Sequence, residues 1–126
     1  MKILLVDDSR TIRKIQIKVL AQLGLTEVVE ANDGAEGLAK VQSDTPDLIL
    51  LDWNMPNMDG LTFLKTLRGV GSKTPVIMVT TESERSRVVE AVQAGINNYM
   101  VKPFTPDALG QKIKETMSKA GLACAC

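Results

Sequence analysis

The sequence predicts an α/β domain in which five short, buried strands alternate with five helices. The strand candidates are apolar runs that begin near residues 3, 27, 48, 76 and 98. Most are apolar throughout and do not alternate, which is typical of parallel strands covered on both faces. Each gap between them carries residues that start and stop helices. We therefore expect a single (βα)5 unit with a parallel sheet.

The first two helices are predicted from their caps and the spacing of their apolar residues. Ser9 can cap a helix that runs to Leu23, and Gly24 would follow it as the C′ glycine. Asn32 or Asp33 can open the second helix. The residues expected on the inward faces are Ile12, Ile15, Val19 and Leu20 in the first helix and Ala35, Leu38, Ala39 and Gln42 in the second.

The last three helices have start and stop signals of the same kind. Asp59-Gly60 precedes the third helix. Ser83 can cap the fourth helix, and Gly95 would end it. Thr105 can cap the fifth helix, with Pro106 at its first position. Their apolar positions are Leu61, Leu64 and Leu67, then Val88, Val89 and Val92, then Leu109, Ile113 and Met117. Gly110 should cost about 1 kcal/mol relative to alanine, so we expect the C-terminal turns of the last helix to fray.

Composition excludes several kinds of function. The 126 residues suit one domain, and 15 basic against 15 acidic residues, without a basic run, argue against nucleic-acid binding. No apolar stretch is long enough for a signal peptide or a membrane span, so a cytoplasmic protein is expected. The chain has no histidine, which excludes Ser-His and Cys-His catalysis. Cys124 and Cys126 cannot complete a zinc site and are expected to be reduced thiols in a frayed tail.

Polar residues follow four of the apolar runs directly, and these residues are the main functional feature of the chain. They are Asp7 and Asp8 after the first run, Asp52 after the third, Thr80 at the end of the fourth and Lys102 after the fifth. In an open parallel sheet, ligands bind beyond the carboxyl ends of the strands. Three carboxylates, a hydroxyl and an amine are therefore expected to meet at one edge.

Such a set of side chains suits phosphoryl transfer with a divalent cation. Adjacent carboxylates at Asp7 and Asp8 would repel a phosphate unless a hard ion such as Mg²⁺ lay between them. With that ion present, Asp52 could attack phosphorus, while Thr80 and Lys102 bond phosphoryl oxygens. Each residue also has a simpler interpretation: an Asp can cap a helix or bond within a turn, and Thr80 and Lys102 are unremarkable alone.

Together, Asp7-Asp8, Asp52, Thr80 and Lys102-Pro103-Phe104 resemble the receiver domain of two-component response regulators. The resemblance extends from Lys2 to about Lys119. The segment 52–61 and the segment 93–95 resemble in particular the chemotaxis members of that family.

The resemblance implies a doubly wound, flavodoxin-like five-stranded parallel sheet with strand order 2-1-3-4-5. It implies that Asp52 accepts phosphate and that Asp7, Asp8, Asp52 and the Asn54 carbonyl form the Mg²⁺ site. Lys102 would pair with the phosphate, before a cis bond to Pro103. Thr80 and Tyr99 would act as a switch pair, although Tyr99 alone suggests ordinary packing at the sheet edge.

The same resemblance implies the partners and the domain limits. A histidine kinase would phosphorylate the chain, a phosphatase is a further expected partner, and a flagellar motor switch protein would bind the surface of the fourth helix, fifth strand and fifth helix. A monomer is expected, with a receiver domain at 1–120, a flexible tail at 121–126, and no DNA-binding output domain. Ser9, Thr81 and the segment 84–87 depart from the chemotaxis pattern, which leaves the partner open.

Two other functions remain open from the sequence. A receiver that acts outside the motor, or as part of another phosphorelay, would share every feature above. An aspartyl-phosphate phosphohydrolase also uses Asp, Thr and Lys at strand ends. Such enzymes resemble a pattern in which the nucleophile and the acid/base Asp lie two residues apart on one strand. In this chain residue 9, two positions after Asp7, is Ser, so that spacing is missing. The acidic first loop argues against a flavin site.

Overall fold

The computed structural model describes residues 1–55, 58–80, 85–102 and 104–119, which form one parallel sheet with helices on both faces. The strands are β1 (Ile3–Val6), β2 (Val28–Ala31), β3 (Leu48–Leu51), β4 (Val76–Thr80) and β5 (Asn98–Val101). Every neighbouring pair is parallel, in the order β2-β1-β3-β4-β5. The predicted doubly wound α/β fold and its strand order are confirmed.

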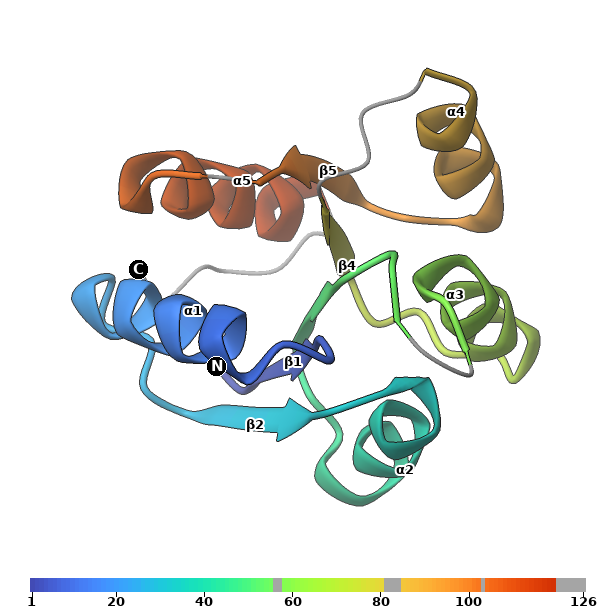
Figure 1. Cartoon of the computed structure of the whole chain (residues 1–126), viewed down its shortest axis with the longest axis horizontal. Coiled ribbons are helices and arrows are strands. Elements are labelled where there is room, and N and C mark those ends of the chain that lie inside the picture. Colours follow the sequence, from blue (N-terminus) through green and yellow to red (C-terminus); the bar gives the residue numbers. More distant parts are fainter. Residues whose placement is uncertain (56–57, 81–84, 103, 120–126) are drawn as a thin grey trace.

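Five helices cover the two faces of this sheet. They are α1 (Arg10–Gln22), α2 (Gly34–Asp44), α3 (Gly60–Gly69), α4 (Arg85–Ala94) and α5 (Pro106–Lys119). Helices α1 and α5 lie on one face, and α2, α3 and α4 lie on the other (Figure 1). An apolar cluster fills each interface, and strands β1, β3 and β4 supply fully buried residues to both clusters. That double burial explains why these strands are apolar throughout.

Four of the predicted helix starts are confirmed by side-chain caps. Ser9, Asp33 and Asp59 each accept a hydrogen bond from the backbone N–H three residues on, and Thr105 Oγ1 accepts one from Ala108 N. Gly24 and Gly95 follow α1 and α4 with φ of 80° and 102°, a backbone conformation that favours glycine. Ser83, Pro103 and the tail 121–126 with its two cysteines lie outside the described residues.

The inward face of α1 differs from the prediction. Val19 and Leu20 are buried and Ile12 is partly buried, but Ile15 is 49% exposed. Arg13 and Gln16 occupy the buried face instead. The inward face of α1 therefore includes the polar residues Arg13 and Gln16, which are three residues apart, and it is rotated away from the face that Ile12 and Ile15 indicated.

Helices α2 and α4 also differ from the prediction, because small residues form their contact faces. In α2, Leu38 is partly buried, whereas Ala35, Ala39 and Gln42 are exposed. Gly34 and Gly37 are buried there, and a Cβ on Gly37 would lie 2.9 Å from the Phe63 ring. In α4, Ala91 is buried, Val88 is partly buried, and Val89 and Val92 are 48% and 59% exposed.

The apolar positions predicted for α3 and α5 are confirmed. Leu64 and Leu67 are fully buried and Leu61 packs against the same cluster. Leu109, Ile113 and Met117 are buried in α5, which is helical through Lys119, so the turns that were expected to fray after Gly110 are formed. Across the described residues, none of the helices has the length and apolar character that crossing a membrane requires.

Candidate functional site

The predicted carboxylates meet at the carboxyl ends of β1 and β3. The two strands are neighbours, and the ladder continues past them because Asp52 N donates to Val6 O at 2.9 Å. Asp7, Asp8 and Asp52 each offer one carboxylate oxygen, and these three oxygens lie within 4.8 Å of one another. Asp7 and Asp52 are buried and Asp8 is exposed, so the cluster is open to solvent on the side of Asp8.

Lys102 joins the cluster from the end of β5, two strands away from β3. Its Nζ lies 3.0 Å from Asp7 Oδ2 and 3.4 Å from Asp52 Oδ1. The Lys102 side chain is 13% exposed, so this ammonium is held between the two buried carboxylates and is little screened by water. The convergence of three carboxylates and one amine, predicted from strand ends up to 95 residues apart, is therefore present.

The crowding of charge shifts the pKa of Asp52. Burial, followed by the negative charge of Asp7, raises this pKa from its usual value of 3.8 to about 6, and Lys102 only partly opposes the rise. When all three carboxylates are ionised, the Lys102 ammonium neutralises only one of their charges, and the cluster keeps a net charge of −2. An all-oxygen donor set with this residual charge fits a hard divalent cation such as Mg²⁺.

Asp7 is held in place more firmly than the other two carboxylates. Its Oδ1 accepts a hydrogen bond from Ser9 N at 2.9 Å, and its Oδ2 accepts one from Lys102. Two hydrogen bonds fix the orientation of this carboxylate. Asp8 is the exposed member of the cluster.

The other predicted site residues lie around this cluster. Thr80 is the last residue of β4 and pairs with Val101 of β5, the residue directly before Lys102. Asn54 is exposed, two residues beyond Asp52. Tyr99 lies in β5, is partly buried and packs against the apolar cluster under α3 and α4.

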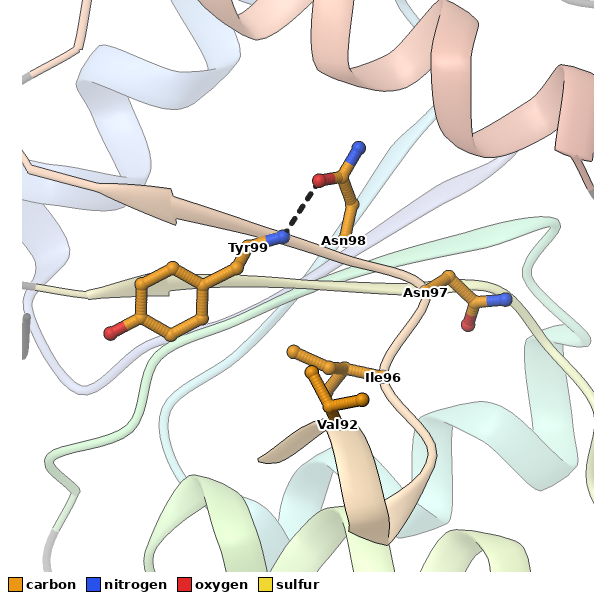
Figure 2. A pocket seen from close by; sticks show the side chains of 5 residues that line it. All are labelled: Val92, Ile96, Asn97, Asn98 and Tyr99. Carbon is orange, nitrogen blue, oxygen red and sulfur yellow. Dashed lines mark hydrogen bonds between the residues drawn. The ribbon is translucent and has the colours of Figure 1, made fainter. Parts of the chain in front are cut away.

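Tyr99 also lines a pocket between α4 and β5 (Figure 2). The pocket has a volume of about 250 Å³ and is lined by Val92, Ile96, Asn97, Asn98 and Tyr99. Figure 2 shows Val92 and Ile96 on one side of the hollow, with the Tyr99 ring beside them. The residue predicted as part of a switch therefore also contributes to a surface pocket.

Three residues around the site were missed by the sequence analysis. Gly60 lies against the main chain of Asp52, where a Cβ would collide with the Asp52 carbonyl oxygen. Arg87 of α4 stacks over the ring of Trp53, the residue after Asp52, at 5.4 Å from the ring centre. Arg13 donates to the Asp7 carbonyl. Hydrophobic spacing in α1 gave no signal for Arg13, because the isoleucines indicated a different inward face.

The chain belongs to the response regulator receiver domain family, whose pattern it matches over residues 3–114. It is similar to the chemotaxis protein CheY of Pseudomonas aeruginosa, with 43% identity over 94% of this chain and 98% of that protein. It is also 44% identical to CheY1 of Helicobacter pylori, over 90% of this chain and 94% of that protein.

Solved structures show the same relationship. CheY4 of Vibrio cholerae is 38% identical with a TM-score of 0.85, over 91% of this chain and 97% of that one. A CheY-like receiver domain of Methanospirillum hungatei is 32% identical with a TM-score of 0.87, over 95% of each chain. The chain is thus a CheY-like receiver of a two-component system, and its relatives support a role in chemotaxis signalling.

Proposed function

We propose that the chain is a phosphorylation switch in which Asp52 takes a phosphoryl group from a histidine kinase in the presence of Mg²⁺. The observation that carries this proposal is the meeting of Asp7, Asp8, Asp52 and Lys102 in one partly buried cluster. In the transfer, an Asp52 carboxylate oxygen forms a bond to phosphorus while the bond from phosphorus to the imidazole nitrogen of the donor breaks. Later attack by water on phosphorus would release inorganic phosphate and restore the carboxylate.

Asp7, Asp8, Asp52 and the carbonyl of Asn54 are the proposed Mg²⁺ ligands. The bound ion would supply positive charge against the oxygens of the transferring group. Lys102 would add its ammonium to the same oxygens, and its present contacts with two carboxylates support this assignment. Asp52 must be ionised to attack, and without an ion its burial beside Asp7 raises its pKa to about 6. The positive charge of the bound ion would favour the ionised carboxylate.

The proposed output surface consists of α4, β5 and α5. A phosphoryl group at Asp52 would attract Thr80, and Tyr99 would then turn inward on the same side of the sheet. The contact of Arg87 with Trp53 supports a coupling between the site and α4. Val89, Val92 and Val101 are exposed on α4 and β5, and Val92 lines the pocket of Figure 2. These apolar side chains support a surface that binds another protein.

The proposed output partner is a flagellar motor switch protein, and a phosphatase would act on the phosphorylated form. The names of the chemotaxis relatives support the motor over another phosphorelay. We also propose that residues 1–120 form the receiver domain, that 121–126 form a tail, and that the chain acts as a monomer in the cytoplasm with these partners.

The phosphohydrolase alternative has little support, because Ser9 Oγ accepts a hydrogen bond from Ile12 N at 3.2 Å and serves as a helix cap. A receiver outside the motor remains a second candidate, since residues 85–87, which depart from the chemotaxis pattern, begin α4 and so belong to the proposed output surface.

Binding assays with a flagellar motor switch protein separate these functions. The chain is treated with acetyl phosphate and Mg²⁺ and its binding is compared with that of Asp52→Asn under the same conditions. Phosphodonor-dependent binding by the wild type alone is expected. Stoichiometric phosphorylation without any gain in binding would reject the motor partner, and turnover of an external phosphomonoester would favour the hydrolase.

A further inference from the structure

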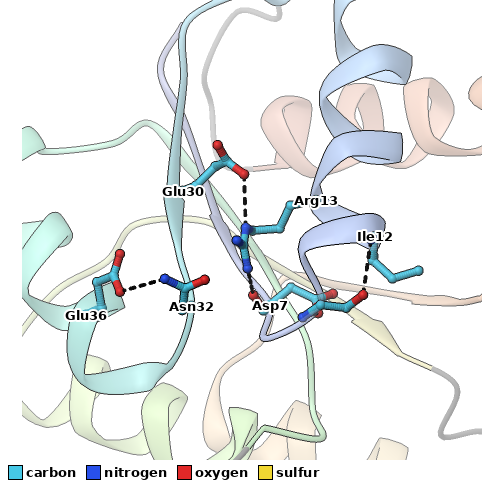
Figure 3. A network of polar contacts seen from close by, with 7 residues as sticks. Asp7, Ile12, Arg13, Glu30, Asn32 and Glu36 are labelled. Carbon is cyan, nitrogen blue, oxygen red and sulfur yellow. Dashed lines mark hydrogen bonds and ion pairs between the residues drawn. The ribbon is translucent and has the colours of Figure 1, made fainter.

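Arg13 is a charged residue buried in the first helix, and its partners lead to the acidic cluster. The residue is 6% exposed. A buried guanidinium is unfavourable unless it is hydrogen bonded. Arg13 Nη1 donates to the Asp7 carbonyl oxygen at 2.5 Å, and Arg13 Nε donates to Glu30 Oε1 at 3.0 Å (Figure 3). The side chain therefore links α1 to the end of β1 and to β2.

The carbonyl that Arg13 holds belongs to the peptide group between Asp7 and Asp8. A peptide group is planar, so fixing its oxygen also fixes the direction of the bond to Asp8. The remaining contacts of Asp7 involve its backbone N–H, which donates to Ala31 O at 3.2 Å, and its carboxylate. Two contacts therefore constrain the main chain between Asp7 and Asp8. The Ser9 N–H bond to Asp7 Oδ1 spans Asp8, and Arg13 holds the peptide oxygen itself.

Glu30 orients the guanidinium from the neighbouring strand. Its side chain is 43% exposed, whereas that of Arg13 is 7% exposed, so the pair reaches from the interior to the surface of β2. Because Arg13 uses different nitrogens for the two partners, one planar group is fixed at two points. A lysine could donate to the carbonyl but could not reproduce this fork.

We propose that Arg13 is a positioning residue for the metal site: it fixes the main chain at Asp7 so that Asp8 points into the cluster, and Glu30 keeps its guanidinium in register. This inference rests on the proposed Mg²⁺ site. A contribution from charge alone would have the opposite sign, because a cation beside the cluster repels Mg²⁺. Removal of Arg13 should weaken Mg²⁺ binding if geometry dominates and strengthen it if charge dominates.

The test is a titration with MgCl₂ alone, followed by isothermal calorimetry and by the fluorescence of Trp53, which is buried next to Asp52. Arg13→Met retains length and apolar packing without the donors. Changes to groups that orient metal ligands typically lower metal affinity by about 10-fold to 100-fold, so we expect Arg13→Met to raise the Mg²⁺ dissociation constant about 10-fold or more. Arg13→Lys should fall between this variant and the wild type. Arg10→Met, an exposed change in the first turn of the same helix, should bind as the wild type does.

A second pair of variants keeps the inference testable if Arg13→Met does not fold. Glu30→Met removes the acceptor, and Glu30→Gln retains an oxygen for Nε while it removes the charge. We expect Glu30→Gln to bind Mg²⁺ more tightly than Glu30→Met. Equal affinity of this pair would overturn the role of Glu30 as an orienting partner.

Urea unfolding of the same variants separates positioning from a purely structural role. A purely structural role would lower the free energy of unfolding of Arg13→Met and leave the Mg²⁺ dissociation constant of the folded protein unchanged. A dissociation constant within twofold of the wild type, or a lower one, would overturn the proposal for Arg13. If the wild type itself shows no saturable Mg²⁺ binding, the proposed function fails as well, so the two failures are distinguishable.

Discussion

Asp52→Asn is expected to stabilise the metal-free protein, although it removes the proposed phosphoacceptor. Asp52 is buried beside Asp7, and its pKa is raised from 3.8 to about 6. An acid whose pKa is higher in the folded state binds protons more tightly when folded. The free energy of unfolding therefore falls as pH rises from about 4 to about 6 and stays low above that range. An amide of similar size carries no charge and avoids this loss.

The size of the effect follows from the pKa shift. A rise from 3.8 to about 6 is worth roughly 3 kcal/mol at about 1.4 kcal/mol per pKa unit. Linkage then predicts that Asp52→Asn gains roughly 3 kcal/mol over the wild type at about pH 7.5 and roughly half of that at about pH 5. Saturating Mg²⁺ should shrink or reverse the gain, because an ion that binds only the folded wild type stabilises it.

The assay is urea unfolding followed by circular dichroism, in chelator and then in Mg²⁺. Asp107→Asn, a change from carboxylate to amide at an exposed site in the first turn of α5, is the matched control. It should lower the free energy of unfolding by no more than about 1 kcal/mol, through the helix dipole. If Asp52→Asn were no more stable than the wild type in chelator at the higher pH, the account of charge crowding would be refuted.

Three further predictions concern the same corner of the sheet. Lys102→Met should raise the pKa of Asp52 above about 6, because it removes an opposing positive charge; carboxyl-carbon NMR across pH measures this, and an unchanged or lower pKa would contradict it. Gly60→Ala should lower the free energy of unfolding by about 1–3 kcal/mol, because its Cβ meets the Asp52 carbonyl oxygen, while Gly69→Ala, whose Cβ meets nothing within 4 Å, should change it by no more than about 1 kcal/mol. Equal effects of the two glycine variants in urea unfolding would contradict the close approach. Asp8→Asn should raise the Mg²⁺ dissociation constant about 10-fold or more in a Trp53 fluorescence titration, and an unaltered titration would remove Asp8 from the ligand set.

The strands and the cluster at their ends could be predicted because both depend on local sequence. An apolar run such as Leu48–Leu51 is buried on both faces, and the polar residue that follows it must lie at the carboxyl edge of the sheet. Asp52 and Lys102 were therefore placed together without knowledge of the contacts between them. The caps at Ser9 and Asp33 were equally local, since each bonds a backbone group three residues away.

Features that depend on distant contacts could not be predicted. Arg13 is buried because the Asp7 carbonyl and Glu30, 17 residues away in the chain, satisfy it, whereas its sequence neighbours indicated a different inward face. Gly60 lies against the Asp52 carbonyl oxygen, where the Gly60 N–H donates to Trp53 O at 2.7 Å. Hydrophobic spacing does not report either contact, because one involves a charge and the other a missing side chain.

The most direct test of the central claim is to find where the phosphoryl group is attached. The chain is treated with acetyl phosphate and Mg²⁺, reduced with borohydride to mark any acyl phosphate, digested, and analysed by mass spectrometry beside Asp52→Asn and a sample in chelator. We expect one modified residue, Asp52, in the wild type with Mg²⁺ and none in the other two samples. Modification at another residue, or the same yield in chelator, would contradict the claim that this cluster is a magnesium-dependent phosphoacceptor site.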